Sequence, residues 1–179
     1  MQTRSITALD QEAIFRRWLE MHLGLMWKVV RGCAAGPEDQ EDLFQEVLLN
    51  VWSSIPAFRG EAKETTWIYR VAFNTALAWR RGERRRREGR EKYLKLEVSP
   101  QVQPSHLENL PEKEIIEQLY AAIRQLPKVD ASLALMHLDG LSYQEMAEVL
   151  GISENYIGVK LNRIRNQLAD QMKGVAHEL

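Results

Sequence analysis

The chain has 179 residues, with 24 lysines and arginines against 25 aspartates and glutamates, and a single cysteine. One cysteine excludes an internal disulfide framework, and the apolar stretches fall short of the roughly 20 residues that a transmembrane helix needs. The first residues also lack the apolar core of a secretory signal peptide. We therefore expect a cytoplasmic protein with no direct membrane insertion.

Positive charge is concentrated in one short stretch of the chain. Residues 80–92 carry 8 basic and 3 acidic side chains, whereas the rest of the chain carries 16 basic and 22 acidic ones. A basic run between acidic blocks predicts contact with a polyanion at one chosen place rather than over the whole surface.

Helical periodicity dominates the first half of the sequence. Apolar residues recur three or four positions apart over 10–35, which predicts a first helix. Gly36 and Pro37 end that helix and begin a second one, which ends at Pro56. A third helix begins near Thr65 and continues into the arginine run. No alternating pattern longer than four residues marks a strand, so the sequence predicts an all-α fold.

The stretch 95–111 differs in character from its surroundings. Its three prolines interrupt the helical pattern and predict an extended linker. Beyond it, apolar residues mark two further helices, at 115–126 and 129–138. We therefore expect two small helical domains, 1–94 and 112–179, joined by a flexible proline-containing linker at 95–111.

The clearest local signal is a pair of helix starts near the C-terminus. Ser142 and Glu145 have the spacing of a capping box, which begins one helix. Gly151 ends that helix, and Ser153 caps the next one. The short turn between them is typical of a helix-turn-helix, where Ala147 lets the two helices cross closely.

The second of these helices carries residue types that suit a DNA major groove. Amides and arginine can read base edges, and lysine can hold a phosphate. The outward positions are Asn155, Tyr156, Val159, Lys160, Asn162 and Arg163. An ordinary helical hairpin with a solvated face is the alternative. The acidic balance of residues 129–179 predicts weak DNA binding by this domain alone.

Aromatic and basic residues interleave along the third helix. Aromatic faces beside cations suit unstacked, single-stranded bases. The alternative is that most of these rings belong to the core, and for Trp67 and Trp79 the two interpretations are equally balanced. The residues concerned are Trp67, Tyr69, Phe73, Trp79, Arg70, Arg80 and Arg81.

Four motifs occur in order along the chain. They are Glu41-Asp42-Leu43-Phe44-Gln45-Glu46-Val47, Phe58-Arg59-Gly60-Glu61, Thr66-Trp67-Ile68-Tyr69-Arg70-Val71-Ala72-Phe73-Asn74 and Gly140-Leu141-Ser142-Tyr143-Gln144-Glu145-Met146-Ala147. Together they resemble the extracytoplasmic-function (ECF) group of bacterial sigma factors, the smallest members of the sigma-70 superfamily. The resemblance covers about residues 10–172.

This resemblance implies a specificity subunit that binds core RNA polymerase, at its β′ clamp and β flap, and promoter DNA. It also implies regulation by an anti-sigma factor, and no cofactor. The implied surface for the clamp coiled coil comprises Asp42, Leu43, Gln45, Glu46 and Leu48. The implied contacts with the minus-ten element are Phe58, Arg59, Gly60, Lys63, Thr65, Trp67, Arg70, Asn74, Arg80 and Arg81. The six outward positions of the helix-turn-helix would read the minus-thirty-five element.

Two other functions compete with this interpretation. A stand-alone helix-turn-helix regulator would normally dimerise, yet no heptad pattern marks a dimerisation segment. An enzyme would need a catalytic constellation, but the four histidines are scattered and no glycine-rich phosphate loop is present. We therefore expect no catalytic residue and no metal ligand.

Overall fold

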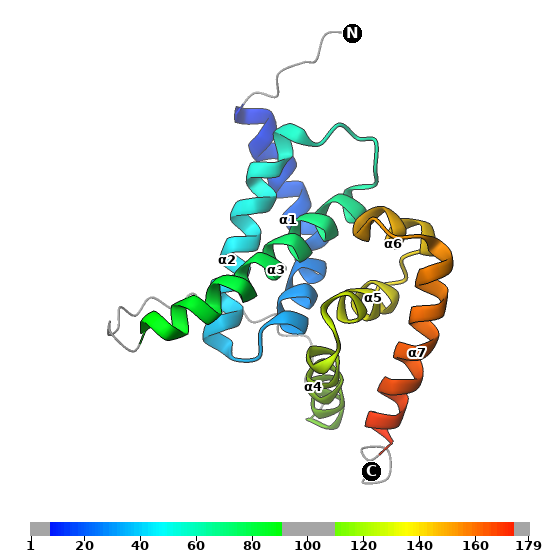
Figure 1. Cartoon of the computed structure of the whole chain (residues 1–179). Helices are drawn as coiled ribbons and strands as arrows, with labels where there is room; N and C mark the ends of the chain where they lie inside the picture. The colour runs from blue at the N-terminus through cyan, green and yellow to red at the C-terminus, as the bar shows by residue number, and fades with distance from the viewer. Residues whose placement is uncertain (1–7, 91–109, 174–179) are drawn as a thin grey trace.

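The computed structural model describes residues 8–90 and 110–173, with side chains described for 9–79 and 114–173. Every regular element within these residues is a helix, which confirms the predicted all-α fold. The elements are α1 (Ala8–Cys33), α2 (Pro37–Ser54), the short 3-10 helix η1 (Ile55–Ala57), α3 (Glu64–Arg90), α4 (Leu110–Gln125), α5 (Lys128–Leu138), α6 (Tyr143–Leu150) and α7 (Glu154–Met172). Figure 1 shows α1–α3, the N-terminal bundle, beside α4–α7, the C-terminal bundle.

Most helix boundaries follow from local chemistry. Pro37 occupies the first turn of α2, where its missing N–H breaks no helical hydrogen bond. The capping box of α6 forms as predicted: the Ser142 N–H donates to Glu145 at 2.8 Å, and the Glu145 N–H donates to the Ser142 hydroxyl at 3.2 Å. Gly151 ends α6 with a positive φ of 68°, a conformation that glycine adopts without strain.

One predicted boundary is wrong. Pro111 was expected to close the linker, but α4 begins at Leu110 and includes Pro111 in its first turn. A proline is compatible with that position because the first N–H groups of a helix have no helical acceptor. Residues 95–109, the rest of the predicted linker, lie outside the described residues.

The buried apolar side chains of the two bundles form one continuous cluster. In the N-terminal bundle, Trp18, Met26 and Ile68 are fully buried. In the C-terminal bundle, Met146 and Ile157 are fully buried, and they fix the angle between α6 and α7. Burial of a large apolar side chain at this depth contributes about 1.5–3 kcal/mol, so each of these residues stabilises its bundle.

The two bundles also pack against each other along a seam formed by α1 and α3 on one side and α4, α5 and α6 on the other. The carboxylate of Asp139 in the C-terminal bundle contacts Lys28 and accepts a hydrogen bond from the Tyr69 hydroxyl, both of the N-terminal bundle. Gly32 lies against Leu135: a Cβ at Gly32 would be 2.5 Å from the Cδ1 of Leu135. The side-by-side arrangement is therefore held by polar and apolar contacts together.

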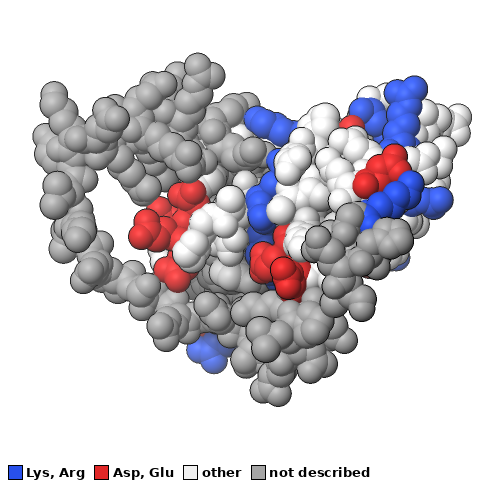
Figure 2. Space-filling model, turned by 90° about the horizontal axis from the view of Figure 1, so that it is seen from below, with Lys and Arg blue, Asp and Glu red and all other residues white. Residues whose placement is uncertain are grey.

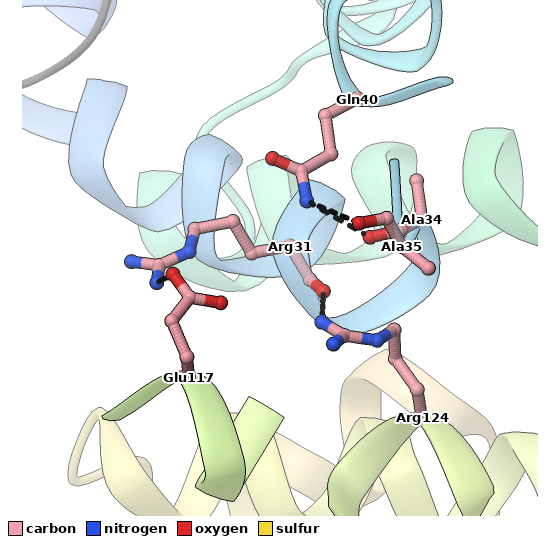
Figure 3. Close-up of polar contacts among 6 residues, drawn as sticks. All are labelled: Arg31, Ala34, Ala35, Gln40, Glu117 and Arg124. Atoms are coloured by element: carbon pink, nitrogen blue, oxygen red, sulfur yellow. Dashed lines mark hydrogen bonds and ion pairs between the residues drawn. The ribbon is translucent and has the colours of Figure 1, made fainter. Parts of the chain in front are cut away.

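The end of α1 meets α4 through a second polar cluster, shown in Figure 3. Arg31 forms an ion pair with Glu117 and lies over the ring of Tyr120, 4.3 Å from its centroid. Arg124 donates a hydrogen bond of 2.9 Å to the backbone carbonyl of Arg31.

Figure 2, a view from below, shows a narrow band of basic side chains with acidic patches on both sides of it. Opposite charges thus alternate on this face of the molecule.

Candidate nucleic-acid interface

A cavity of about 310 Å³ opens at the junction of η1, the following loop and α3. Four of the residues predicted to contact the minus-ten element line it: Phe58, Arg59, Trp67 and Arg70. The remaining wall comes from Ala57, Glu61 and Ala62. Glu61 belongs to one of the four sequence motifs, but neither it nor the two alanines was among the predicted minus-ten contacts.

The aromatic wall of the cavity is positioned by packing and by one hydrogen bond. Phe58 packs edge-on against Trp18, with ring centroids 5.2 Å apart, and lies 5.6 Å from the ring of Trp67. The indole N–H of Trp67 donates to the Ser54 hydroxyl at 3.0 Å. Two rings held in this way form a rigid surface on which an unstacked base can stack.

Charged groups complete the lining of the cavity. Arg59 and Glu61 are exposed, and within the part of the chain that the structure describes no hydrogen bond or ion pair engages either side chain. The Arg70 guanidinium donates to the backbone carbonyl of Glu148 in α6. The cavity thus combines aromatic faces with cations and one carboxylate, the groups that bind and read a nucleobase.

Other predicted minus-ten residues lie near the cavity without lining it. Gly60 turns the loop with a φ of 72°, Thr65 is half-buried in the first turn of α3, and Asn74 is exposed two turns further along that helix. Lys63 is exposed and paired with Glu145. The side chains of Arg80 and Arg81 lie outside those described.

Trp67 and Trp79, for which the core and the nucleic-acid interpretations were equally balanced, lie in different environments in the structure. Trp67 is half-buried and lines the cavity, whereas Trp79 is only 3% exposed and belongs to the core. Tyr69 and Phe73 are buried as well, with their rings stacked 5.5 Å apart. Most of the aromatic residues on α3 therefore stabilise the bundle.

The predicted polymerase-binding surface lies on α2. Asp42 and Gln45 are exposed, and Glu46 and Leu48 are half-buried. Leu43 requires a correction, because it is fully buried with Val47 and Val51 on the inner face of the helix. Leu49, which the sequence analysis did not single out, is the exposed apolar residue of this helix, with 67% of its surface accessible.

The helix-turn-helix is formed by α6 and α7. Asn155, Tyr156, Val159, Asn162 and Arg163 are exposed on α7, as predicted. Lys160 is different: its ammonium lies 2.9 Å from Asp130 Oδ1, and its side chain is only 24% exposed. The ammonium also donates a hydrogen bond of 3.1 Å to Asp130 Oδ2, which raises the pKa of Lys160 above its ordinary value.

The two candidate DNA surfaces touch each other across the seam, where Figure 1 shows α6 beside the start of α3. The Lys63 ammonium lies 2.7 Å from Glu145 Oε1. The hydrogen bond from Lys63, followed by those from Ser142, lowers the pKa of Glu145 to about 2. A predicted minus-ten contact, Lys63, thus pairs with the capping residue of the first helix of the helix-turn-helix.

Neither a metal cluster nor a membrane span was found among the described residues. No group of three or more His, Cys, Asp or Glu side chains there is arranged to hold a metal ion. No described helix is both long and apolar enough to cross a bilayer.

Comparison with known proteins places both bundles in one family. Residues 18–86 match the sigma-70 region 2 model, and residues 116–168 match the sigma-70 region 4 model. The ECF RNA polymerase sigma-E factor of Haemophilus influenzae is 28% identical over 143 residues, 75% of each chain. The ECF sigma factor SigE of Mycolicibacterium smegmatis is 26% identical over 176 residues, 95% of this chain and 67% of that one.

Solved structures agree at the level of the fold. The sigma factor RpoE in its complex with the anti-sigma factor NepR from Bartonella quintana has a TM-score of 0.67 and 19% identity, covering 89% of this chain and 96% of that one. CnrH in complex with the cytosolic domain of CnrY has a TM-score of 0.64 and 14% identity, covering 91% and 90%. The chain belongs to the sigma-70 family, and within it to the ECF group of RNA polymerase sigma factors.

Proposed function

We propose that this sigma factor directs promoter-specific initiation by capturing a flipped base of the minus-ten element in the cavity beside Phe58. The observation that carries this proposal is the cavity itself, with aromatic rings fixed on one side and charged groups at its rim. An enzyme or a reader that handles a single base takes it out of the stack and holds it between aromatic and polar groups. The lining by Phe58, Trp67, Arg59 and Arg70 supports that chemistry.

The remaining roles follow the same division of the chain. Residues 1–94 would bind core polymerase and the minus-ten element, 95–109 would connect the domains, and the C-terminal bundle, from Leu110 on, would read the minus-thirty-five element. On α2, the exposed Asp42 and Gln45 with the half-buried Glu46 and Leu48 would face the β′ clamp. On α7, the exposed amides, Tyr156, Val159 and Arg163 would enter the major groove. The C-terminal bundle would also contact the β flap.

The protein would act in the cytoplasm as a binding subunit, without catalytic residues, cofactor or metal of its own. An anti-sigma factor is the regulator that we propose. Of the two solved neighbours, RpoE is bound to the anti-sigma factor NepR, and CnrH is bound to the cytosolic domain of CnrY.

The closed arrangement of the bundles cannot be the promoter-bound one. The minus-ten and minus-thirty-five elements are about 25 base pairs apart, roughly 85 Å at 3.4 Å per pair. In the structure, Lys63 and Glu145 connect the two readers at 2.7 Å. The 19 residues from 91 to 109 reach about 65 Å when extended, which lets the bundles separate. We therefore propose that promoter binding requires the seam to open.

Transcription with purified bacterial core polymerase on a randomised promoter library tests the proposal. Start sites that share two spaced elements only when this protein is added are the expected result. Glu46→Lys should abolish this activity through loss of core binding, whereas Arg59→Ala should retain core binding and lose promoter opening. Arg16→Ala, the same change at another exposed arginine, on α1, is the matched control for Arg59→Ala. Normal core affinity in the Glu46→Lys variant, or normal opening with Arg59→Ala, contradicts the assigned sites.

A further inference from the structure

Lys160 differs from the other candidate readers on α7 because its positive charge is already paired with a carboxylate of the protein itself, that of Asp130. Its ammonium lies 2.9 Å from one carboxylate oxygen of Asp130 and 3.1 Å from the other. The Asp130 side chain is only 13% exposed, and that of Lys160 only 24%. This is a half-buried ion pair between α5 and α7, close to the surface that would meet DNA.

The position of Lys160 on the helix explains why the pair forms. Its neighbours Ile157 and Leu161 are buried, so the Lys160 side chain leaves α7 at the edge of the inner face. The first turn of α5, which packs against α7, brings Asp130 to that edge. One turn earlier on α7, the ring of Tyr156 lies 5.7 Å from the ammonium. The ammonium is therefore held between a carboxylate and an aromatic ring.

We infer that Asp130 is a positioning residue that keeps Lys160 from neutralising a DNA phosphate, so that the reader helix recognises bases with little phosphate attraction. This inference rests on the proposed role of α7 in reading the minus-thirty-five element. A phosphate contact by Lys160 would separate it from Asp130 and leave a nearly buried carboxylate without its partner. Phosphate contacts add affinity for any sequence, whereas base contacts discriminate between sequences. Suppressing one phosphate contact therefore raises the fraction of the binding free energy that depends on the DNA sequence.

The salt dependence of promoter binding measures this directly. Each neutralised phosphate adds about 0.9 to the slope of log affinity against log salt concentration. We would measure the slope for core polymerase carrying wild-type protein, Lys160→Met, Asp130→Asn or the double variant, on one promoter duplex from the library. Wild type and Lys160→Met should have the same slope. Asp130→Asn should be steeper by about 0.9, which is about 3.5-fold more affinity lost for a fourfold rise in salt.

The double variant and a charge control separate positioning from other effects. Asp130→Asn combined with Lys160→Met should return to the wild-type slope, since the added contact is made by Lys160. Asp170→Asn makes the same change in net charge at an exposed pair with Lys173, near the far end of α7, and should leave the slope unchanged. A slope that falls by about 0.9 in Lys160→Met, or no change in Asp130→Asn, overturns the inference.

Lysine labelling of the full-length free protein tests the ion pair without DNA. Acylation followed by mass spectrometry should modify Lys160 several-fold more slowly than the exposed Lys128, and Asp130→Asn should remove that difference. Equal labelling of the two lysines in the wild type overturns the pairing. If no polymerase complex binds the promoter, the wild-type one included, the proposed function is refuted instead. The labelling result still tests the ion pair between Lys160 and Asp130 in that case.

Discussion

One hydrogen bond, from the hydroxyl of Tyr69 to Asp139, joins the two bundles at the seam. Tyr69 is fully buried in the N-terminal bundle, and its hydroxyl donates to Asp139 of the C-terminal bundle. Burial, and then the hydrogen bond to Asp139, raise the pKa of Tyr69 above its ordinary value, so the group is a neutral donor at any physiological pH. Replacing Tyr69 by Phe removes this hydrogen bond and keeps the ring that stacks on Phe73 at 5.5 Å.

The expected effect follows from the charge of the acceptor. A hydrogen bond to a charged group contributes about 1.5–3 kcal/mol, which shifts the ratio of closed to open protein by about 10- to 140-fold. Asp139 keeps Lys28 as a partner, so the variant leaves no isolated buried charge. If only the open form binds core polymerase, the apparent affinity is the intrinsic affinity multiplied by the open fraction. Tyr69→Phe should therefore tighten core binding by up to that factor, until the open form dominates.

A binding titration of core polymerase with fluorescently labelled protein measures the change, and circular dichroism verifies that the variant is folded. Tyr120→Phe is the matched control: this tyrosine also lies at the seam, but its described contact with the other bundle is the Arg31 guanidinium over its ring. The control should bind like the wild type. A folded Tyr69→Phe variant with unchanged or weaker core affinity would refute the idea that the closed form limits binding.

Two further predictions concern the seam. Gly32→Leu should push the bundles apart, because a Cβ at this position would already lie 2.5 Å from the Cδ1 of Leu135. Small-angle scattering should then give a radius of gyration well above the roughly 16 Å expected for a compact chain of this length. An unchanged radius of gyration would contradict this prediction. Since the pKa of Glu145 is lowered to about 2, its contribution to the folded state is complete above the unfolded pKa near 4.5 and is lost as the pH falls toward 2. Carboxyl NMR titration should find this low pKa, and Lys63→Met should raise it only in part, because the Ser142 hydrogen bonds remain.

The helix-turn-helix could be predicted in detail because its determinants are local. The capping box, the left-handed Gly151 and the inward Ile157 all act within a few residues of their own position in the chain. The burial of Leu43 was also readable: Leu43, Val47 and Val51 are four residues apart, and that spacing places all three on one helix face. The error lay in treating a family motif as a surface without applying the helical period to it.

The seam could not be predicted, because its contacts join residues far apart in the sequence. Lys28 and Asp139 are 111 positions apart, and Arg31 and Glu117 are 86 apart. Neither partner carries a local signal: a lysine on a helix and an aspartate in a turn are ordinary surface residues until the bundles meet. The same holds for Asp130, whose pairing with Lys160 depends on how α5 packs against α7.

The charged contacts of the seam add only modestly to the free energy of opening it. The Lys63–Glu145 pair leaves 74% of the lysine exposed, and exposed pairs of this kind contribute about 0–1 kcal/mol. Charged residues are depleted at the centres of permanent interfaces, yet Lys28, Arg31 and Asp139 all lie at this one. When the bundles separate, water can solvate each of these charges, so opening leaves no unpaired charge buried. A seam built in this way would open for a partner that binds either bundle tightly, as we propose for the promoter-bound polymerase.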